Sequence, residues 1–314
     1  MLMPAPRVSA VITAWNAEAT LERAIRSALA ERPAVGEVIV ADDGSTDGTA
    51  AIAAGFGDDV RLLRLPHRGQ AAATNAGVEA ARGELVAILH DDDEWLPGKT
   101  ARSVAALEAA PKAAVAYTDL ILVRPDSSEV GTFLADKPFA ASGRVFEALL
   151  AQCFVLPSAV TFRREAFRDA GLSFADDLVV AVDYDVWLRA ARRFEFVRVA
   201  EPLVRRLLRP GAAGTDLKRL REDHVRVFRR LREQVVREEG PAAASLAVLD
   251  RRLAGFEAGL GHDRYRAGDV AGARRLLAAS LGRRPAARTA LLWMLSLAGR
   301  PGRSLLAAAR GWRE

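Results

Sequence analysis

Apolar and polar residues form two different patterns along the first hundred residues. Short runs rich in β-branched residues, typical of buried strands, are separated by segments whose apolar residues recur at helical spacing. The predicted strands lie at 7–15, 36–42, 60–65 and 83–90, and the predicted helices at 16–31, 49–56 and 69–82. Strand–helix alternation at this spacing predicts right-handed βαβ units and a mainly parallel sheet covered by helices.

The pattern is more mixed between residues 105 and 214, and it is helical beyond them. Strands are predicted at 113–123, 158–164 and 194–208, and helices at 144–152, 165–172 and 182–194. Pro210, Gly211 and Gly214 mark a boundary. Residues 261–300 resemble one tetratricopeptide-like helical hairpin, although a repeat fold needs roughly three such units or more.

Composition narrows the class of protein. The 314 residues are 50% apolar and 27% charged, the profile of a soluble globular protein with room for about two domains. The only cysteine, Cys153, excludes an internal disulfide and fits a reducing cytoplasm. We expect neither a signal peptide nor a membrane span, because no apolar run approaches roughly 18 residues. The net charge of +5 by itself selects no partner.

Two acidic clusters directly follow predicted strands. Asp42-Asp43 ends the second strand, and Asp91-Asp92-Asp93 ends the fourth. Because ligands bind at the carboxyl ends of such strands, we expect both clusters to form one site. A divalent cation such as Mg²⁺ or Mn²⁺ would relieve their repulsion and could bind a diphosphate. The alternative for the first cluster is a surface turn with a helix cap from Ser45, Thr46 or Asp47.

Four segments resemble the family 2 glycosyltransferases in their letters and in their order. They are "VSAVITAWNAEATLERAIRSAL", "VIVADDGSTDGT", "RGQAAATNAGVEAARGELVAILHDDDEWLPGK" and "VDYDVWLRAA", within about residues 7–209. The resemblance implies an α/β GT-A fold, that of nucleotide-diphospho-sugar transferases, with a mainly parallel mixed sheet flanked by helices. It also implies a donor-binding half at 1–104, an acceptor-binding half with the catalytic base at 105–214, and an α-helical C-terminal extension at 215–314.

The resemblance places the nucleoside of the donor beside the first two strands. Thr13 and Trp15 fall where the family contacts the nucleobase, and an aromatic ring there can stack on a pyrimidine. Asp43 falls on the aspartate that reads the base or ribose, with Asp42 beside it. These four residues are therefore expected donor contacts.

Further donor contacts are implied by the third segment. Asn75 matches the helix that lines the pyrophosphate region in the family. Thr74 stands where the family usually has arginine, and Arg68 could make up for that missing cation. Asp91 could take the ribose contact of a carboxylate that this chain lacks.

The resemblance also implies a metal site and a catalytic base. His90 replaces the first aspartate of the family's metal motif, and Asp92 falls on the metal-binding aspartate, so these two are the expected ligands of Mg²⁺ or Mn²⁺. The segment "VDYDVWLR" makes Asp183 the expected general base, which takes the proton of the acceptor hydroxyl during attack on the anomeric carbon. Direct displacement inverts that carbon. Asp185 would shape the acceptor side, and Trp187 would pack beneath the site or stack on a sugar.

Departures from the family pattern leave a second interpretation open. His90, Thr74 and Val182, which replaces a glutamate, are compatible with a catalytically impaired nucleotide-sugar-binding or scaffold protein on the same fold. Arg206 and Arg209 stand near the position of a family histidine. Each could contact the diphosphate or face solvent, and for Arg206 the solvent-facing interpretation is favoured.

Other function classes fit the sequence less well. A nucleotidyltransferase would need a basic, glycine-rich loop after the first strand, which residues 13–23 lack. Acids interspersed among the arginines of 217–239 favour a solvated, salt-bridged helix over a nucleic-acid-binding surface, although such a helix could also rest on anionic lipid. The expected partners are a nucleotide-sugar donor, commonly a UDP-sugar on this fold, and a saccharide or lipid-linked acceptor. We expect a cytoplasmic protein, with peripheral contact at the inner face of the plasma membrane as an option.

Overall fold

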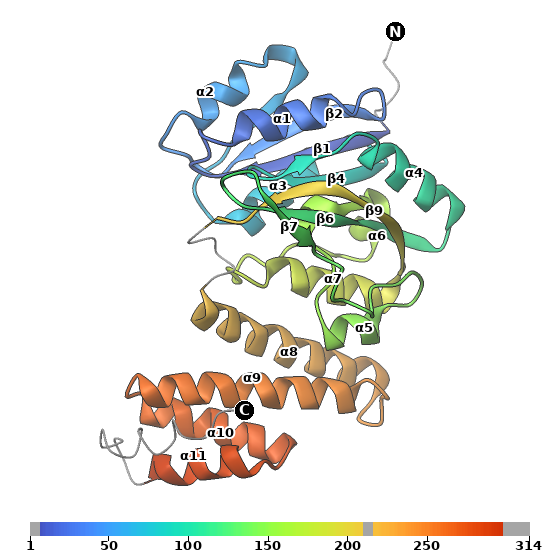
Figure 1. Cartoon of the computed structure of the whole chain (residues 1–314). Coiled ribbons are helices and arrows are strands. Elements are labelled where there is room, and N and C mark those ends of the chain that lie inside the picture. Colours follow the sequence, from blue (N-terminus) through green and yellow to red (C-terminus); the bar gives the residue numbers. More distant parts are fainter. Residues whose placement is uncertain (1–6, 210–215, 298–314) are drawn as a thin grey trace. The chain divides into compact units, whose positions relative to one another are not determined.

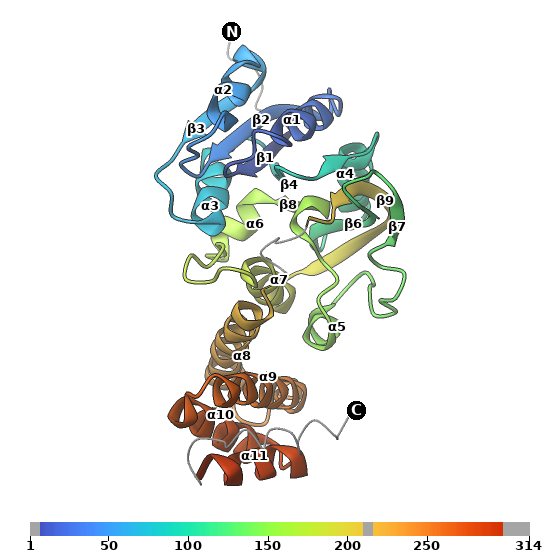
Figure 2. The ribbon, with the colours of Figure 1, turned by 60° about the vertical axis from the view of Figure 1, so that its left-hand side comes forward.

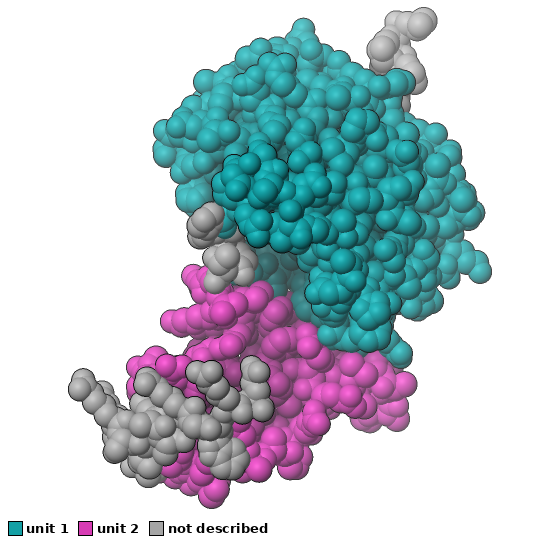
Figure 3. Space-filling model, viewed as in Figure 1, with its two compact units in different colours: residues 1–215 teal, residues 216–314 magenta. Residues whose placement is uncertain are grey.

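A computed structural model of the chain describes residues 7–209 and 216–297, and every structural statement below refers to them. The chain forms two compact units, Met1–Thr215 and Asp216–Glu314, which Figure 3 colours teal and magenta. We call them unit 1 and unit 2. Unit 1 is a sheet with helices on both faces, and unit 2 is helical (Figure 1).

Unit 1 is built on a nine-stranded sheet with strand order β3-β2-β1-β4-β8-β6-β9-β5, and β7 pairs with β6. The strands are β1 (Val8–Ala14), β2 (Val35–Asp42), β3 (Arg61–Arg64), β4 (Leu85–His90), β5 (Glu94–Trp95), β6 (Ala113–Val123), β7 (Glu129–Thr132), β8 (Val160–Arg163) and β9 (Glu195–Leu207). The first four strands in this order pair in parallel, and so do β6 and β9. Because β8 runs antiparallel to β4 and β6, the sheet is mixed, as predicted.

Helices cover both faces of the sheet, as Figure 2 shows. The helices of unit 1 are α1 (Leu21–Leu29), α2 (Thr49–Ala54), α3 (Gln70–Ala80), α4 (Lys99–Ala109), α5 (Phe146–Ala151), α6 (Arg164–Asp169) and α7 (Val182–Arg193), with short 3₁₀ turns η1 (Gly57–Asp59) and η2 (Pro157–Ala159). The alternation of side chains along β1 decides which helix packs on which face. Ala10 and Ile12 join one core cluster with α1 and α4.

The opposite face of β1 carries α3 at very close range. A Cβ atom added at Gly77 would lie 2.4 Å from Cγ1 of Val11, so only glycine allows α3 to lie this near to the strand. The hydroxyls of Thr13 and Thr74 lie 3.0 Å apart at the same interface. The start of α3 is thereby fixed beside the carboxyl ends of β1 and β4.

Three elements of unit 1 were not among the predicted ones. The helix α4 buries Ser103, Val104 and Leu107 on one face, but its apolar pattern is short. The strand β5 has two residues, and β7 is an exposed edge strand. The predicted division at 104/105 falls inside α4.

Unit 2 contains α8 (Leu217–Glu239), α9 (Leu246–Arg266), α10 (Val270–Arg283) and α11 (Ala287–Leu297). Each helix packs on the next. Asp269 caps α10 by accepting the Gly272 N–H at 2.8 Å, and Tyr265 and Leu277 form a small core with α11. Residues 298–300 of the predicted hairpin lie outside the described residues. In the described parts of both units, every helix is too short or too polar to cross a membrane.

Candidate active site

The carboxyl ends of β1, β2 and β4 meet the start of α7 at one cavity in unit 1. Its volume is about 590 Å³. The predicted site residues that line it are Thr13, Trp15, Asp43, His90, Asp91, Asp92 and Asp183. The structure therefore joins both acidic clusters and the expected base, which are far apart in the sequence.

Asp43 organises the loop between β3 and α3. Its buried carboxylate accepts hydrogen bonds from the N–H groups of Arg68 at 2.8 Å and Gly69 at 2.9 Å. Gly69 has φ +96°, a conformation that favours glycine, and this lets both N–H groups point at one carboxylate. His67 Nδ1 lies 2.9 Å from the same carboxylate. Asp43 thus holds one wall of the cavity in place.

Trp15 forms a platform at the mouth of the cavity. The residue is 51% exposed, which is unusual for tryptophan, and its ring stacks on His67 with ring centroids 4.7 Å apart and planes 16° apart. The Trp15 N–H donates to Asp91 Oδ2 at 3.1 Å. Because His67 supports one face of the Trp15 ring, the other face can accept a flat ligand ring. A tryptophan buried in the core could not do this, since both of its faces would be covered.

Three of the predicted donor residues do not line the cavity. Asp42 is buried and accepts the Ser45 N–H at 3.0 Å, so it shapes the turn after β2. The Asn75 amide exchanges two hydrogen bonds with the backbone of Phe174, which itself lines the cavity. The Arg68 side chain is directed to Asp176, 3.7 Å away. In this structure their contribution to the cavity is positional.

A compact group of ligand atoms lies where β4 ends. One atom each from His90, Asp92 and Asp93 are within 4.8 Å of one another. Asp93 is buried, and its Oδ1 has no hydrogen-bond partner among the described residues, while Oδ2 accepts from Ser158. A buried carboxylate oxygen without a donor is costly. Nitrogen and carboxylate oxygens at this spacing fit a divalent cation such as Mn²⁺ or Mg²⁺.

The electrostatics of this group also favour a cation. Burial, reinforced by Asp92, raises the pKa of Asp91 to about 7, and burial raises the pKa of Asp93 to about 6. Burial lowers the pKa of His90, which keeps its imidazole neutral and able to ligate a metal. His90 Nε2 lies 2.6 Å from the Gln70 amide nitrogen, which can only donate, so Gln70 orients the ring. A cation would take His90 as ligand either at Nε2, in place of this contact, or at Nδ1 once the Gln70 amide has turned to accept from Nε2. Arg209 lies at the rim, with Nη2 2.7 Å from Asp92 Oδ2.

Asp183 lines the same cavity from the first turn of α7. It makes no ion pair among the described residues, and its Oδ1 accepts the Tyr184 N–H at 2.8 Å. Burial raises the pKa of Asp183, with the Tyr184 hydrogen bond and Arg206 opposing the shift. Two residues on, Asp185 is tied to Arg189 at 2.6 Å. The two carboxylates of this helix therefore differ: one faces the cavity and the other is neutralised.

The structure decides between the alternative positions that the sequence left open for Trp187 and Arg206. Trp187 is fully buried in an aromatic cluster with Phe162, Phe167 and Phe174, so it packs beneath the site. The favoured solvent-facing interpretation of Arg206 is wrong. Arg206 lines the cavity, and its Nη1 is buried without a hydrogen-bond partner among the described residues. An unpaired guanidinium donor in the same cavity as these acids is suited to an anionic ligand.

Several contributors were missed by sequence reasoning. His67 is a single histidine in a loop, and only the fold brings it under Trp15. Asp93 is not among the ligands expected from the sequence, although the triple aspartate was a signal. Ser158 also donates to Asp93 and accepts the His90 N–H at 3.1 Å. Its role depends on β8 pairing beside β4, which no local pattern reveals.

Comparison with known sequences identifies a family to which the chain is similar. The family model described as glycosyl transferase family 2 matches residues 9–171. The succinoglycan biosynthesis protein ExoO of Rhizobium meliloti is 31% identical over 265 residues, covering 80% of this chain and 74% of that protein. Further curated relatives are matched over 60 to 67% of their own length.

Solved structures resemble the chain at low sequence identity, and this likeness concerns the fold alone. S. aureus TarS in complex with UDP-GlcNAc superposes with a TM-score of 0.67 at 18% identity, over 91% of this chain and 83% of that one. The mannosyltransferase PcManGT from Pyrobaculum calidifontis, in complex with GDP-Man and Mn²⁺, gives 0.56 at 19% identity, over 93% and 84%. With the family match over half of the sequence, the chain belongs to glycosyl transferase family 2 and is a glycosyltransferase.

Proposed function

We propose that the chain is a metal-dependent, inverting glycosyltransferase that takes its sugar from a nucleoside diphosphate. One observation carries this proposal: a single cavity holds an aromatic platform, a cation-binding group and a separate carboxylate with a raised pKa. These are the parts needed to hold a nucleotide, stabilise a departing diphosphate and remove a proton.

The donor would bind along the edge formed by β1, β2 and β4. The base stacks on the exposed face of Trp15, whose other side rests on His67. The TarS and PcManGT complexes contain UDP-GlcNAc and GDP-Man respectively, which supports a nucleotide sugar as donor without deciding its base. Asp91 is held by the Trp15 N–H at 3.1 Å, close enough to this platform to accept from a ribose hydroxyl.

His90, Asp92 and Asp93 would hold the divalent cation, since their ligand atoms converge and Asp93 Oδ1 lacks a donor within 7–209 and 216–297. When bound, the cation supplies positive charge to the diphosphate. Arg206 contributes a second positive charge from the protein itself, with a buried Nη1 ready to donate. Arg206 would thus supply the positive charge that the family usually has from an arginine in α3, where this chain has Thr74.

Asp183 would act as general base. Its carboxylate accepts the proton of the acceptor hydroxyl while the oxygen attacks the anomeric carbon, and the bond to the diphosphate oxygen breaks on the opposite side. The Tyr184 N–H fixes the carboxylate, and burial raises its pKa and hence its basicity. Displacement of this kind inverts the anomeric configuration. ExoO is named for succinoglycan biosynthesis, which supports a saccharide acceptor in polysaccharide assembly.

The proposal is tested by donor turnover in the presence and absence of metal. Cleavage of UDP- and GDP-sugars should stop when the protein is treated with EDTA and return with Mn²⁺ or Mg²⁺. With an accepted glycan, the product should carry the opposite anomeric configuration to the donor, as read by NMR. Turnover that survives exhaustive chelation, or a product that retains the donor configuration, would contradict the metal requirement or the inverting mechanism respectively. Tight nucleotide-sugar binding without turnover would instead indicate a binding protein.

A further inference from the structure

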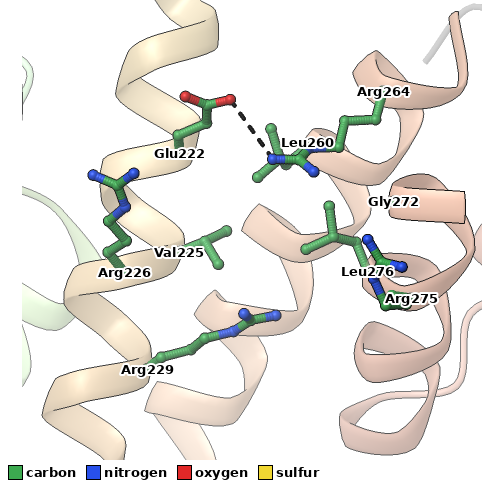
Figure 4. Close-up of a pocket in the computed structure, with 9 residues that line it drawn as sticks. All are labelled: Glu222, Val225, Arg226, Arg229, Leu260, Arg264, Gly272, Arg275 and Leu276. Atoms are coloured by element: carbon green, nitrogen blue, oxygen red, sulfur yellow. Dashed lines mark ion pairs between the residues drawn. The ribbon is translucent and has the colours of Figure 1, made fainter. Parts of the chain in front are cut away.

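A second cavity lies within unit 2, between α8, α9 and α10 (Figure 4). Its volume is about 450 Å³, inside the roughly 300–1,000 Å³ range of small-molecule sites. Four of its lining residues are arginines, one from α9, one from α10 and two from α8, and only one is acidic, Glu222. Such an excess of positive charge around a concave site calls for an anionic ligand.

Two of the arginines are held in position before any ligand arrives. Arg229 donates from Nε and Nη2 to the buried carboxylate of Glu257, at 3.0 and 2.7 Å. Arg264 donates to Asp269 at 3.2 Å and lies 3.9 Å from Glu222, the ion pair drawn in Figure 4. A guanidinium carries five N–H donors, so each still has donors to offer. Because their side chains are already ordered, ligand binding costs less conformational entropy.

Arg275 on α10 differs from these two arginines. It makes no hydrogen bond or ion pair with any residue that the structure describes, and it is exposed at the cavity. Its charge is therefore not neutralised within the described protein. A carboxylate or phosphate entering the cavity would meet one uncommitted guanidinium and two fixed ones.

The rest of the lining narrows the class of anion. Val225, Leu260 and Leu276 are buried and give the cavity an apolar wall. Glu222 places an acceptor among the donors, which suits hydroxyl groups but would repel a bare phosphate dianion. Donors, an acceptor and an apolar wall match the carboxylate, hydroxyls and C–H face of an acidic sugar. A flat lipid surface fits poorly, because these groups line a recess rather than a protruding face.

We propose that this cavity binds an acidic saccharide, a sugar unit that carries a carboxylate, through Arg229, Arg264 and Arg275. Unit 2 then holds an anionic glycan at a site separate from the donor cavity of unit 1. The choice of a saccharide rests on the proposed function, whereas the preference for an anion rests on the lining alone.

The test measures binding of a tetramer of galacturonic acid to the full-length protein by calorimetry, without donor or metal. The neutral maltotetraose, inorganic phosphate and vesicles containing phosphatidylglycerol are the comparison ligands. We expect the acidic tetramer to bind, with affinity that falls as salt rises, and maltotetraose not to bind. Loss of one charge-assisted contact and repulsion by the new acid in Arg275→Glu should weaken binding about tenfold or more.

Arg251→Glu is the matched control, because Arg251 is an exposed arginine of α9 outside this lining and the substitution changes the net charge equally. It should bind like the unmodified protein, and circular dichroism melting should show both variants folded. Equal loss in both variants, or binding of vesicles or phosphate but not of the tetramer, would overturn the proposal. Asp183→Asn should bind the tetramer normally, so a failure of the catalytic proposal would leave this result unchanged.

Discussion

Carboxylates in the cavity of unit 1 and carboxylates in unit 2 differ in what neutralises them. In unit 1, Asp183 has no ion pair among the described residues and Asp93 has a buried oxygen without a donor. In unit 2, Glu257 is equally buried, but both of its oxygens accept from arginines, Arg229 at 2.7 Å and Arg283 at 3.1 Å. Asp250 is likewise shared by two arginines.

This difference separates acids that await a ligand from acids that hold helices together. Burial raises the pKa of Asp183 and Asp93, because the neighbouring groups that the structure describes only partly stabilise their charge. A protein keeps such groups at a cost in stability when a substrate or cation supplies the missing charge or proton. Glu257 and Asp250 of unit 2 are compensated internally, so their removal should affect stability first.

The largest expected effect is on catalysis in Asp183→Asn. Removal of the general base should lower kcat by roughly 10²–10⁴-fold, and the free energy of unfolding should stay equal or rise. The sign follows from the raised pKa: the ionised form is penalised in the folded state at neutral pH, and asparagine lifts that penalty. Steady-state kinetics and urea denaturation measure the two quantities.

Asp185→Asn is the control for that substitution, since Asp185 lies on the same helix and is paired with Arg189 at 2.6 Å. It should lower stability while costing much less in kcat. If both variants lost activity alike, or if Asp183→Asn were the less stable one, the contrast between free and paired carboxylates would not hold.

The reverse outcome is expected in unit 2 for Glu257→Gln. The amide NH₂ would face one of the two arginines, and a charge that serves both would be lost. We expect a loss of about 2 kcal/mol of unfolding free energy, below the roughly 3–5 typical of fully buried pairs because Arg229 is partly exposed. Glu233→Gln, at an exposed position on α8, the helix that carries Arg229, should change the unfolding free energy by less than about 0.5 kcal/mol. Equal melting of the two variants in urea would contradict a structural role for the network.

Several strands of unit 1 and its shared acidic site could be predicted because their signals are local. Apolar runs gave strand β6 at the bounds that it has, 113–123, and two acidic strand ends predicted a shared site. The elements that were missed, such as β7 and the two-residue β5, have no buried pattern of their own. They exist because a neighbouring strand offers hydrogen-bond partners.

Side-chain roles within the site were less predictable, because they depend on register and on loops. Period-two alternation puts Arg205 and Arg206 on opposite faces of β9, but the sequence does not say which face meets the cavity. In the structure Arg205 reaches Glu129 and Arg206 lines the cavity. Asn75 matched a phosphate-lining motif, yet its amide fixes the Phe174 backbone, a contact 99 residues away.

A smaller effect is expected in the pH dependence of kcat/KM. Asp183 works only when ionised, and burial raises its pKa above the ordinary 3.8. Activity should therefore fall on the acid side at a higher pH than an ordinary aspartate would give, by about tenfold per pH unit below that pKa. Rates measured with saturating Mn²⁺ across the acid range, with Asp183→Asn as reference, check this. An acid limb of the same position and slope in that variant would assign it to another group.

The smallest effect concerns Arg209 and the cation. Its Nη2 lies 2.7 Å from Asp92 Oδ2, so a cation that takes Asp92 as ligand must displace a positive charge. Since the Arg209 side chain is 43% exposed, the pair is worth no more than about 1 kcal/mol, and Arg209→Ala should tighten Mn²⁺ binding by up to about fivefold. Electron paramagnetic resonance titration of the donor-free protein measures this affinity.

The control is Arg205→Ala, which breaks a pair with Glu129 instead and should leave the Mn²⁺ affinity unchanged. Weaker Mn²⁺ binding in Arg209→Ala alone would mean that Arg209 assembles the acidic group rather than competing with the cation for it. The acids of the cavity would then depend on an arginine of the protein, as Glu257 of unit 2 does, and the contrast between the two units would be smaller.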